Sequence, residues 1–540
     1  MPREKSKASS TSVSVKDATL DLLRAFGIKK VFGNPGSTEL PFLSDWPGDI
    51  DYVLGLQEAS VIGMADGYAQ ATRNAGFVNL HSAAGVGNAL GNIFTAYRNQ
   101  TPLVITAGQQ ARSILPLEPF LYAERASEFP RPYVKFSVEP ARAEDVPAAI
   151  ARAYYVAMQP PCGPTFVSVP IDDWTHQAEP VEARSISREL GPDPEAMHAL
   201  AAALDSSKRP ALVVGPAIDR AQAVDLMVQV AEKAKAAVWV SPFSSRCSFP
   251  ERHPQFAGFL HAAPGQLSDV LCQYDLVVVI GAPVFTFHVE GDAPVFDGTT
   301  QIFQITDDPG AAAITPSGAS IVATMKPALT MLLALLPATQ RDVIKGRKLP
   351  PRPQASDPIP VDFLMHTLST LMPANAMLVE EAPSHRPLMN RFLPMRGQDS
   401  FVTMASGGLG YGLPASVGVA LGRPQIRTVC LIGDGSAMYS IQALWTAAQR
   451  KLPLTVVVIN NLGYGAMRSF SEVMQVRGVP GLDLPGIDFV GIAQGMGCDA
   501  VRVSQVAHLA PELSRGLAHD GVSLIEVMVE SAVPLLYAKS

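Results

Sequence analysis

Short apolar runs rich in valine and isoleucine recur along the whole chain, each followed by a glycine-containing turn and an amphipathic stretch. Examples are FVNLHSA, PLVITAG, PALVVG, LVVVIGAP, TVCLIGDG and PLTVVVIN. Nearly continuous runs of this kind are typical of strands buried on both faces of a parallel sheet. The helical stretches between them indicate repeated βαβ units. The sequence therefore predicts an α/β fold built from mainly parallel sheets flanked by helices.

Two polar segments without periodicity divide the chain, at residues 172–195 and at the proline-dense residues 346–361. Segments of this composition are typical of linkers. A chain of 540 residues also has the length of about three domains. We therefore expect three domains, each with its own sheet, at residues 13–185, 186–345 and 362–535.

Composition excludes several classes of function. The net charge is −7, and no basic run follows the first seven residues, so a nucleic-acid binder is not expected. No apolar run approaches the roughly 18 residues of a membrane span. The first residues are polar, so we expect no secretory signal and a frayed N-terminal tail. The five cysteines are scattered without a CxxC pair. This pattern supports neither a zinc site nor a disulfide framework and favours a cytoplasmic location.

The strongest local signal is the turn Gly433-Asp434-Gly435-Ser436, which follows an apolar strand and opens a helix. The next apolar strand ends in Asn460-Asn461. Asp434 and Asn461 should therefore lie at the carboxyl ends of successive strands, where open α/β sheets bind ligands. Their oxygen atoms suit Mg²⁺, and the helix that starts near Ser436 favours an anion. The pattern predicts a magnesium–diphosphate site.

Three further polar residues follow apolar strands: Glu58 in GLQEAS, His81 in NLHSAAG and His288 after VIGAPVFTF. A glutamate at a helix start is favoured by the helix dipole alone, without any catalytic role. A histidine at a strand end is commonly structural, although an imidazole can exchange a proton near pH 7. The residues by themselves leave both interpretations open.

The motif GDGS followed by NN resembles the cofactor motif of thiamine diphosphate (ThDP) enzymes. The segments VFGNPGSTELPFL, GLQEASVIGMADGYAQAT, NLHSAAGVGNALGNI, PLVITAGQQAR and GGLGYGLPA resemble the 2-oxo acid decarboxylases of that family, most of all the benzoylformate decarboxylases. The resemblance covers about residues 13–535. It implies the ThDP-binding fold, with an N-terminal pyrimidine-binding domain, a central α/β domain and a C-terminal diphosphate-binding domain.

The resemblance also assigns cofactor residues. It implies that Glu58 bonds N1′ of the aminopyrimidine, that the Gly407 carbonyl meets the 4′ amino group, and that Leu409 props the bent cofactor. It implies a metal, Mg²⁺ or Ca²⁺, on Asp434, Asn461 and the Gly463 carbonyl. The remaining residues that it places on the cofactor are Ser384, Gly435, Ser436 and Tyr464.

Substrate residues come from the same source. His81 and His288 match the two active-site histidines, which would share the proton transfers, and Ser37 matches the serine that binds the substrate carboxylate. The pocket positions are Thr403, where the family has an aromatic residue, Met467, where it has leucine, and Phe470. Arg386 near this pocket raises the alternative of a polar or anionic 2-oxo acid.

The reaction implied is non-oxidative decarboxylation of a 2-oxo acid, with benzoylformate or a related aryl acid as the expected substrate. An acetolactate synthase-type carboligase is the alternative. FAD is not expected, because PALVVGPAIDRA in the central domain lacks a full GxGxxG motif. A non-catalytic relative is a third, weaker alternative. In ThDP enzymes the two halves of the site come from different subunits, so the resemblance implies a homo-oligomer, commonly a tetramer built as a dimer of dimers.

Overall fold

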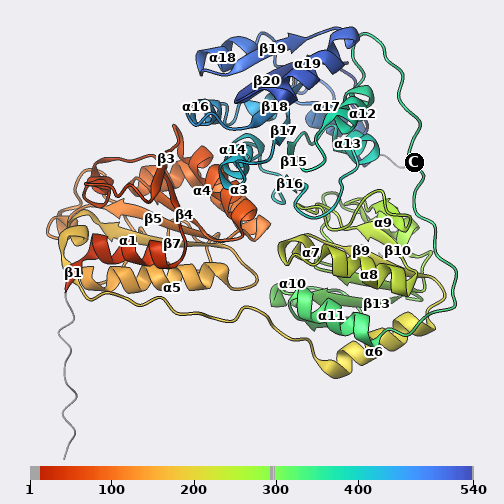
Figure 1. Cartoon of the computed structure of the whole chain (residues 1–540), viewed down its shortest axis with the longest axis horizontal. Helices are drawn as coiled ribbons and strands as arrows, with labels where there is room; N and C mark the ends of the chain where they lie inside the picture. Colours follow the sequence, from red (N-terminus) through yellow and green to blue (C-terminus); the bar gives the residue numbers. More distant parts are fainter. Residues whose placement is uncertain (1–11, 292–295, 297, 538–540) are drawn as a thin grey trace, which may run out of the picture. The chain divides into compact units, whose positions relative to one another are not determined.

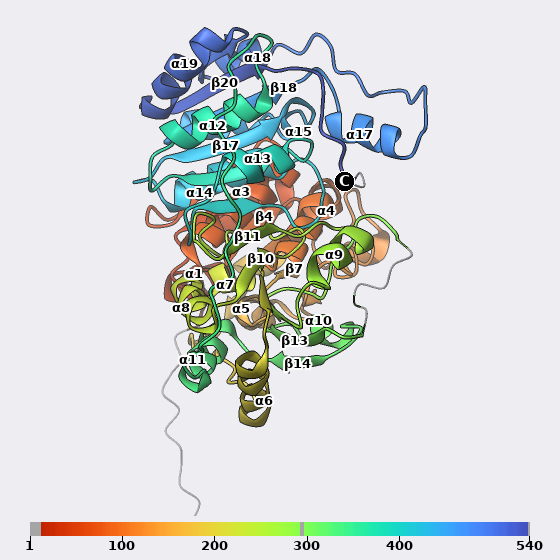
Figure 2. The same ribbon diagram turned by 90° about the vertical axis from the view of Figure 1, so that its right-hand side faces the viewer.

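The computed structural model describes residues 12–291, 296 and 298–537. The tail that the sequence predicts to be frayed, residues 1–11, lies outside this range. In the described part the chain forms three six-stranded sheets, in which every strand pair is parallel (Figures 1 and 2). A small antiparallel pair joins β1 (Val13–Ser14) to β8 (Gln177–Ala178). The predicted fold class is confirmed.

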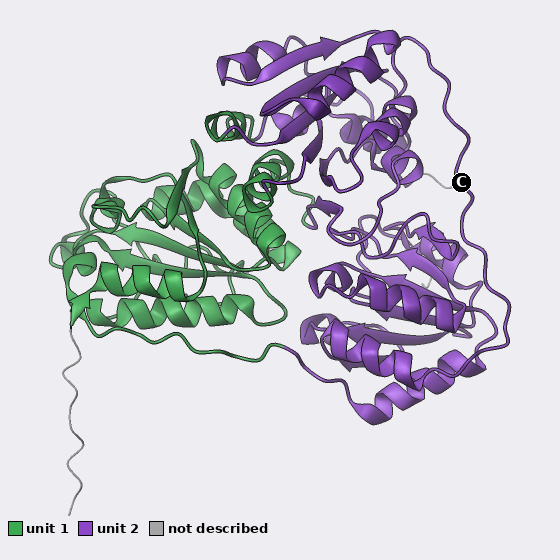
Figure 3. Ribbon diagram, viewed as in Figure 1, with its two compact units in different colours: residues 1–188, 406–423, 440–450 green, residues 189–405, 424–439, 451–540 purple. Residues whose placement is uncertain are grey.

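The chain divides into two compact units (Figure 3). Unit 1 contains residues 1–188, 406–423 and 440–450, and unit 2 contains residues 189–405, 424–439 and 451–540. Unit 1 holds one of the six-stranded sheets and unit 2 holds the other two. Two helical segments from the last third of the sequence thus belong to the same unit as the N-terminal sheet.

The sheet of unit 1 has the strand order β3-β2-β4-β5-β7-β6. Every residue of β4, β5 and β7 is buried, as expected for strands covered on both faces. Helices α1 and α5 cover one face, and α3 and α4 cover the other (Figure 1). The strands are β2 (Lys30–Gly33), β3 (Asp51–Leu54), β4 (Gly76–Leu80), β5 (Leu103–Gln109), β6 (Ser137–Val138) and β7 (Pro164–Pro170). The helices are α1 (Val15–Ala25), η1 (Ser37–Glu39), α2 (Leu40–Leu43), α3 (Glu58–Thr72), α4 (Ser82–Asn99), η2 (Leu115–Leu117), η3 (Ala143–Asp145), α5 (Val146–Met158) and η4 (Ile171–Thr175).

Helix α14 (Gly412–Gly422) lies against α3 inside unit 1, and glycines permit this close crossing. A Cβ atom added at Gly67 would lie 2.0 Å from Ala415 O, and one added at Gly418 would lie 1.9 Å from Met64 O. Any larger residue at either position would force the two backbones apart. The short α16 (Ala443–Gln449) also belongs to unit 1.

The central sheet, in unit 2, has the strand order β11-β10-β9-β12-β13-β14. Counted along the chain this is 3-2-1-4-5-6, the order of an open doubly wound sheet. Buried residues of α6, α8 and α11 form the core on one face, and α9 contributes to the core on the other. The strands are β9 (Pro210–Val214), β10 (Ala237–Val240), β11 (Phe256–Phe259), β12 (Leu276–Ile280), β13 (Gln301–Thr306) and β14 (Ala319–Val322). The helices are α6 (Pro194–Ser206), α7 (Ala217–Arg220), α8 (Val224–Ala234), α9 (Pro264–Leu271), α10 (Pro309–Ala313) and α11 (Met325–Leu335).

The third sheet, also in unit 2, has the order β16-β15-β17-β18-β20-β19, which repeats along the chain the order of the sheet in unit 1. In both sheets the order reverses between the first and third strands, and ligands bind outside the carboxyl ends at such a point. The strands are β15 (Met377–Glu381), β16 (Phe401–Thr403), β17 (Thr428–Gly433), β18 (Leu454–Asn460), β19 (Asp499–Val503) and β20 (Val522–Met528). The helices are α12 (Val361–Leu371), α13 (Arg386–Phe392), α15 (Asp434–Ala437), α17 (Gly465–Val473), α18 (Phe489–Gly495) and α19 (Val506–Ala518).

In residues 12–291, 296 and 298–537, no helix combines the length and apolar character that crossing a membrane requires.

Candidate active site

Asp434 lies at the end of β17, beside the switch point of the third sheet. Its side chain is buried, and its two carboxylate oxygens accept hydrogen bonds from Gly435 N at 2.8 Å and Gly463 N at 2.9 Å. The second bond holds the loop after β18 against the turn after β17. Burial raises the pKa of Asp434, against the opposing effect of these N–H donors. A bound cation would stabilise the carboxylate in this position.

Two further predicted residues, Asn461 and Ser384, meet at the start of α17. A Cβ added at Gly465 would lie 2.7 Å from Asn461 Nδ2 and 2.9 Å from Ser384 Oγ. In the same way a Cβ at Gly435 would lie 2.5 Å from the ring of Tyr464. The structure thus brings the predicted cofactor residues of unit 2 together around two glycines that admit no side chain.

The donor atoms in this cluster suit the predicted group. A carboxylate on Asp434, an amide oxygen on Asn461 and a main-chain carbonyl on Gly463 are hard oxygen ligands of the kind that Mg²⁺ and Ca²⁺ prefer. The buried Ser436 follows Gly435 in the turn, and backbone N–H groups there can bind phosphate oxygens. The residues present fit a metal–diphosphate group.

Glu58 is the first residue of α3, and its side chain is 9% exposed. Asn34 Nδ2 donates to its Oε1 at 3.2 Å, and Asn88 Nδ2 donates to its Oε2 at 3.1 Å. Neither asparagine was predicted from the sequence, because each lies more than 20 residues from Glu58. The two amides fix the orientation of the carboxylate, and each oxygen keeps a lone pair for a further partner.

The turn that contains Gly407 and Leu409 is tied to the start of α3. Asn92 Nδ2 donates to Ala59 O at 2.7 Å and to Gly410 O at 3.1 Å. Gly407 has a φ of +75° and is exposed, whereas Leu409 is half-buried. The left-handed conformation favours glycine at position 407. Unit 1 thus places the predicted turn beside the helix that carries Glu58.

His81, the residue that follows β4, is held by a buried carboxylate. Its Nδ1 lies 2.8 Å from Glu39 Oε2, and Glu39 is 1% exposed. Glu39 also accepts hydrogen bonds from Gly36 N at 2.8 Å, Gly108 N at 3.1 Å and Thr38 Oγ1 at 2.6 Å. An ionised carboxylate only accepts, so it binds the Nδ1–H tautomer and leaves Nε2 of a neutral His81 as the acceptor.

Sequence reasoning missed Glu39, although GSTE at a helix start is a capping signal. Ser37 opens η1, two residues before Glu39, and its side chain is exposed. A Cβ added at Gly36 would lie 2.2 Å from His81 Nδ1. The absence of a side chain at this position is therefore what lets the turn close on the histidine.

In unit 2, His288 meets the predicted pocket residue Phe470. The two rings are 5.1 Å apart in an edge-to-face arrangement. Met467 lies almost one turn earlier on α17 and is 49% exposed. This side of unit 2 presents an apolar and aromatic surface next to a histidine.

Thr403 and Arg386 belong to a buried network around Glu380, which is fully buried. Arg386 Nε donates to Glu380 Oε2 at 3.0 Å, and Arg386 Nη2 donates to Thr403 Oγ1 at 2.9 Å. Thr403 is 1% exposed, and its hydroxyl lies 2.8 Å from Glu380 O. The place of Thr403 in a substrate pocket remains a prediction. The charge of Arg386 is already balanced by Glu380, which weakens the case for an anionic side chain on the substrate.

His385, next to Arg386, gives a testable dependence of stability on pH. It is 2% exposed, and burial lowers its pKa from the ordinary 6.5 to about 4. Between these values the unfolded chain binds a proton that the folded chain does not, so the free energy of unfolding falls as the pH falls. From pH 7.5 to 5.0 we expect a loss of about 2 kcal/mol from this residue.

The measurement is the urea midpoint at both pH values, for the wild type and for His385→Gln. The variant should lose less stability in acid than the wild type, because position 385 no longer takes up a proton. His366→Gln on α12 is the matched control. An equal acid loss in the wild type and in His385→Gln would contradict this account.

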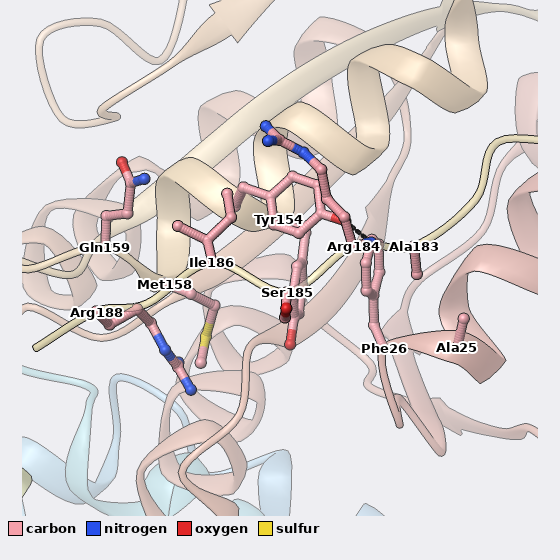
Figure 4. A pocket seen from close by; sticks show the side chains of 11 residues that line it. Ala25, Phe26, Tyr154, Met158, Gln159, Ala183, Arg184, Ser185, Ile186 and Arg188 are labelled. Atoms are coloured by element: carbon pink, nitrogen blue, oxygen red, sulfur yellow. Dashed lines mark hydrogen bonds between the residues drawn. The ribbon is translucent and has the colours of Figure 1, made fainter.

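Unit 1 also has a separate cavity of about 390 Å³, which is lined by none of the predicted site residues (Figure 4). It lies between α5, the end of α1 and the segment 183–188, and its walls include Phe26, Tyr154 and Arg188. Phe26 and Tyr154 stack at 3.9 Å. The cavity is therefore not part of the candidate site.

The three parallel sheets and the glycine-lined cluster around Asp434 fit a thiamine pyrophosphate enzyme, and three family models assign the chain to that class. The N-terminal thiamine pyrophosphate-binding domain matches residues 13–125, the central domain matches residues 197–332, and the C-terminal thiamine pyrophosphate-binding domain matches residues 382–527.

The chain is 41% identical over 526 residues to benzoylformate decarboxylase of Pseudomonas aeruginosa, covering 96% of this chain and 100% of that protein. The crystal structure of benzoylformate decarboxylase from Polynucleobacter necessarius matches with a TM-score of 0.95 at 41% identity, over 97% of this chain and 100% of that one. The 4-hydroxybenzoylformate decarboxylase of Rhodococcus jostii matches with a TM-score of 0.94 at 40% identity, over 96% of this chain and 100% of that one. The chain belongs to the ThDP-dependent 2-oxo acid decarboxylase family and is an enzyme of the carboxy-lyase class, a homologue of benzoylformate decarboxylase.

Proposed function

We propose that this enzyme decarboxylates an aryl 2-oxo acid, benzoylformate or a ring-substituted relative, to the aldehyde and CO₂, with ThDP and Mg²⁺ or Ca²⁺. The main support for an aryl substrate is the edge-to-face contact between the rings of His288 and Phe470, next to the exposed Met467. The balanced charge of Arg386 supports an uncharged substrate side chain. The three relatives described above are all named for aryl 2-oxo acids, which agrees with this choice.

Residues of unit 2 would hold the cofactor. Asp434, Asn461 and the Gly463 carbonyl would bind the metal. The diphosphate would lie against Ser384, Gly435, Ser436 and Tyr464. When bound, ThDP supplies the electron sink that decarboxylation of a 2-oxo acid requires.

Residues of unit 1 would contact the aminopyrimidine ring of ThDP. Glu58 would hold a proton on its carboxyl group toward N1′, in the orientation set by Asn34 and Asn88. Gly407 would accept a hydrogen bond through its carbonyl, and Leu409 would support the bound cofactor. Burial of Glu58 keeps water from competing for this proton.

His81, His288 and Ser37 would serve the substrate. Ser37 would donate to the substrate carboxylate through its exposed hydroxyl. His81 would accept a proton at Nε2, because Glu39 holds its Nδ1–H. This pairing explains why a buried carboxylate lies behind the histidine.

The substrate proposal is tested by comparing kcat/KM for benzoylformate, 4-hydroxybenzoylformate, pyruvate and 2-oxoglutarate. We expect at least about 10²-fold preference for the aryl acids, since the pocket gains apolar contact only with a ring. Met467→Leu is the matched variant and should preserve this order. Acetolactate formation from pyruvate as the faster reaction, or a yellow flavin in the purified protein, would favour the carboligase alternative instead.

Glu39→Gln should lower kcat by about 10²- to 10⁴-fold, because a histidine that loses its orienting carboxylate adopts the wrong tautomer. The amide N–H₂ of glutamine would face Gly36 N, Gly108 N and the Thr38 hydroxyl, which all donate to Glu39 and cannot accept from it in this arrangement. KM should change little, because Glu39 itself is buried away from substrate. The kcat of the variant is measured from pH 5 to 8, with Glu139→Gln as control, since Glu139 accepts a hydrogen bond from the Ser168 hydroxyl at 2.6 Å and, among the described residues, has no hydrogen bond to a histidine. A kcat equal to the wild-type value would remove Glu39 from the mechanism.

We propose a homo-oligomer, a tetramer arranged as a dimer of dimers, in which each site takes Glu58 from one subunit and Asp434 from another. Glu58 lies in unit 1 and Asp434 in unit 2, so the two residues belong to separate compact parts of the chain. Mixing Glu58→Gln with Asp434→Ala after dissociation should restore activity, up to about a quarter of the wild-type value by random pairing in dimers. An inactive mixture of re-associated chains would contradict shared sites, as would a fully active monomer.

We infer a cytoplasmic location. No disulfide joins any of the five cysteines, and three of them, Cys247, Cys430 and Cys498, are buried. Proteins with reduced cysteines are typical of reducing compartments. The inference is tested by fractionating cells that express the natural protein.

A further inference from the structure

His288 is held in a cage of aromatic rings, which we define as Phe243, Phe470 and Tyr537. All three rings meet the imidazole edge to face, with centroids 5.9, 5.1 and 5.5 Å away. The main-chain N–H of His288 donates to Ala262 O at 2.9 Å. The backbone of His288 is therefore anchored, and its ring contacts three aromatic rings although the residue is exposed.

Tyr537 comes from the C-terminal segment and is anchored on α17. Leu536 N donates to Ser469 Oγ at 2.7 Å, and Ser469 is fully buried. The Tyr537 ring also stacks on Phe470, with centroids 5.9 Å apart. The segment is thus attached to the same helix that carries the proposed pocket residues Met467 and Phe470.

The Tyr537 hydroxyl lies 3.2 Å from His288 Nδ1. Burial raises the pKa of this hydroxyl, although the nearby Arg386 acts in the opposite direction. The phenol therefore keeps its proton near neutral pH and has one to donate. When Nδ1 of a neutral imidazole accepts a hydrogen bond, the ring proton lies on Nε2.

We propose that Tyr537 is a positioning residue for His288, whose hydroxyl donates to Nδ1 and thereby makes Nε2–H a hydrogen-bond donor to an oxygen atom of the substrate. This inference rests on the proposed function, which places His288 at the substrate. It gives the two histidines opposite tautomers. Glu39 accepts from Nδ1–H of His81 and leaves Nε2 as an acceptor, whereas Tyr537 donates to Nδ1 of His288 and leaves Nε2 as a donor.

The test uses Tyr537→Phe, which removes the hydroxyl and keeps the ring, in the full-length holoenzyme. Tyr274→Phe is the matched control, because the Tyr274 hydroxyl also meets an aromatic ring nitrogen, Trp239 Nε1 at 3.1 Å, in the central sheet. The first readout needs no activity. It is the rate at which diethyl pyrocarbonate modifies His288, followed by mass spectrometry of the peptide that contains it.

Freeing Nδ1 should raise this modification rate by about tenfold in Tyr537→Phe, in line with the loss of one hydrogen bond. The rate in Tyr274→Phe should stay at the wild-type value. The second readout is kinetic: kcat for benzoylformate should fall by about tenfold with KM within about twofold.

An unchanged modification rate overturns the proposal, whatever the activity. A raised rate with unchanged kcat overturns it as well, because the hydrogen bond then has no effect on the reaction. A wild-type enzyme that releases no aldehyde from any 2-oxo acid overturns the proposed function instead, and the modification rates tell these failures apart.

Discussion

Glu58→Gln should lower kcat for aldehyde release by about 10²- to 10⁴-fold, the range for loss of a general acid–base group. A glutamine keeps the size of the side chain but cannot hold an exchangeable acidic proton toward N1′. Its N–H₂ group would also face Asn34 or Asn88, which both donate to Glu58. The variant should still bind ThDP, because the residues proposed to bind the metal and the diphosphate lie in unit 2.

The measurement combines kcat with a ThDP titration followed by tryptophan fluorescence. Asn88→Ala is the graded comparison, since it keeps the carboxylate and removes one donor; it should cost about tenfold in kcat. A Glu58→Gln enzyme within tenfold of wild type would contradict the assigned role. A variant that binds no ThDP would instead indicate that Glu58 acts in assembly of the site.

Asp434→Ala should weaken ThDP binding in the presence of Mg²⁺ by at least about 10²-fold, since even residues that only support a metal ligand cost 10–100-fold. Alanine removes the one carboxylate of the proposed donor set. It also leaves the N–H groups of Gly435 and Gly463 without their acceptor, so the loop after β18 loses its link to the turn after β17.

The dissociation constant of ThDP is measured at fixed Mg²⁺ in wild type, Asp434→Ala and Asp434→Asn. Asp434→Asn should give a dissociation constant between those of the other two proteins, because the amide oxygen of asparagine can still accept a hydrogen bond from Gly435 N or Gly463 N. Asp483→Asn is the control: Asp483 lies beside the same loop but is largely exposed and pairs with Arg468. Equal ThDP affinity in wild type and Asp434→Ala would place the metal elsewhere.

Much of the fold follows from local patterns in the sequence. Strands such as β18 are apolar on both faces, and a parallel sheet must bury both. The rule that polar residues gather at the carboxyl ends of strands then brings Asp434 and Asn461 together.

Helix α14 is a different case. Its sequence, GLPASVGVALG, is apolar on all sides, which indicates full burial but does not say that it lies on α3.

The supporting residues of the site were beyond sequence reasoning. Glu39 lies 42 residues from His81, and Tyr537 lies 249 residues from His288, so no periodicity connects them. The same holds for Asn34 and Asn88 around Glu58. Each pair forms only when the sheet and its loops have folded, because long-range contacts depend on topology and not on local propensity.

Arg386 shows what a local pattern leaves out. A basic residue near a pocket predicts an anionic ligand, and the sequence offered that alternative. The partner Glu380 is only six residues away, but it lies within β15, where a charged side chain is not expected to be buried. The structure pairs the two charges, so the guanidinium is an internal hydrogen-bond donor to Glu380 and Thr403.

The most direct test of the whole account is the stoichiometry of the reaction with benzoylformate. The enzyme is reconstituted with ThDP and Mg²⁺ and assayed without oxygen or any electron acceptor. The account predicts one benzaldehyde and one CO₂ for each benzoylformate consumed, and no turnover when ThDP is withheld. Consumption that requires an electron acceptor and yields benzoate, or turnover that is independent of ThDP, would contradict it.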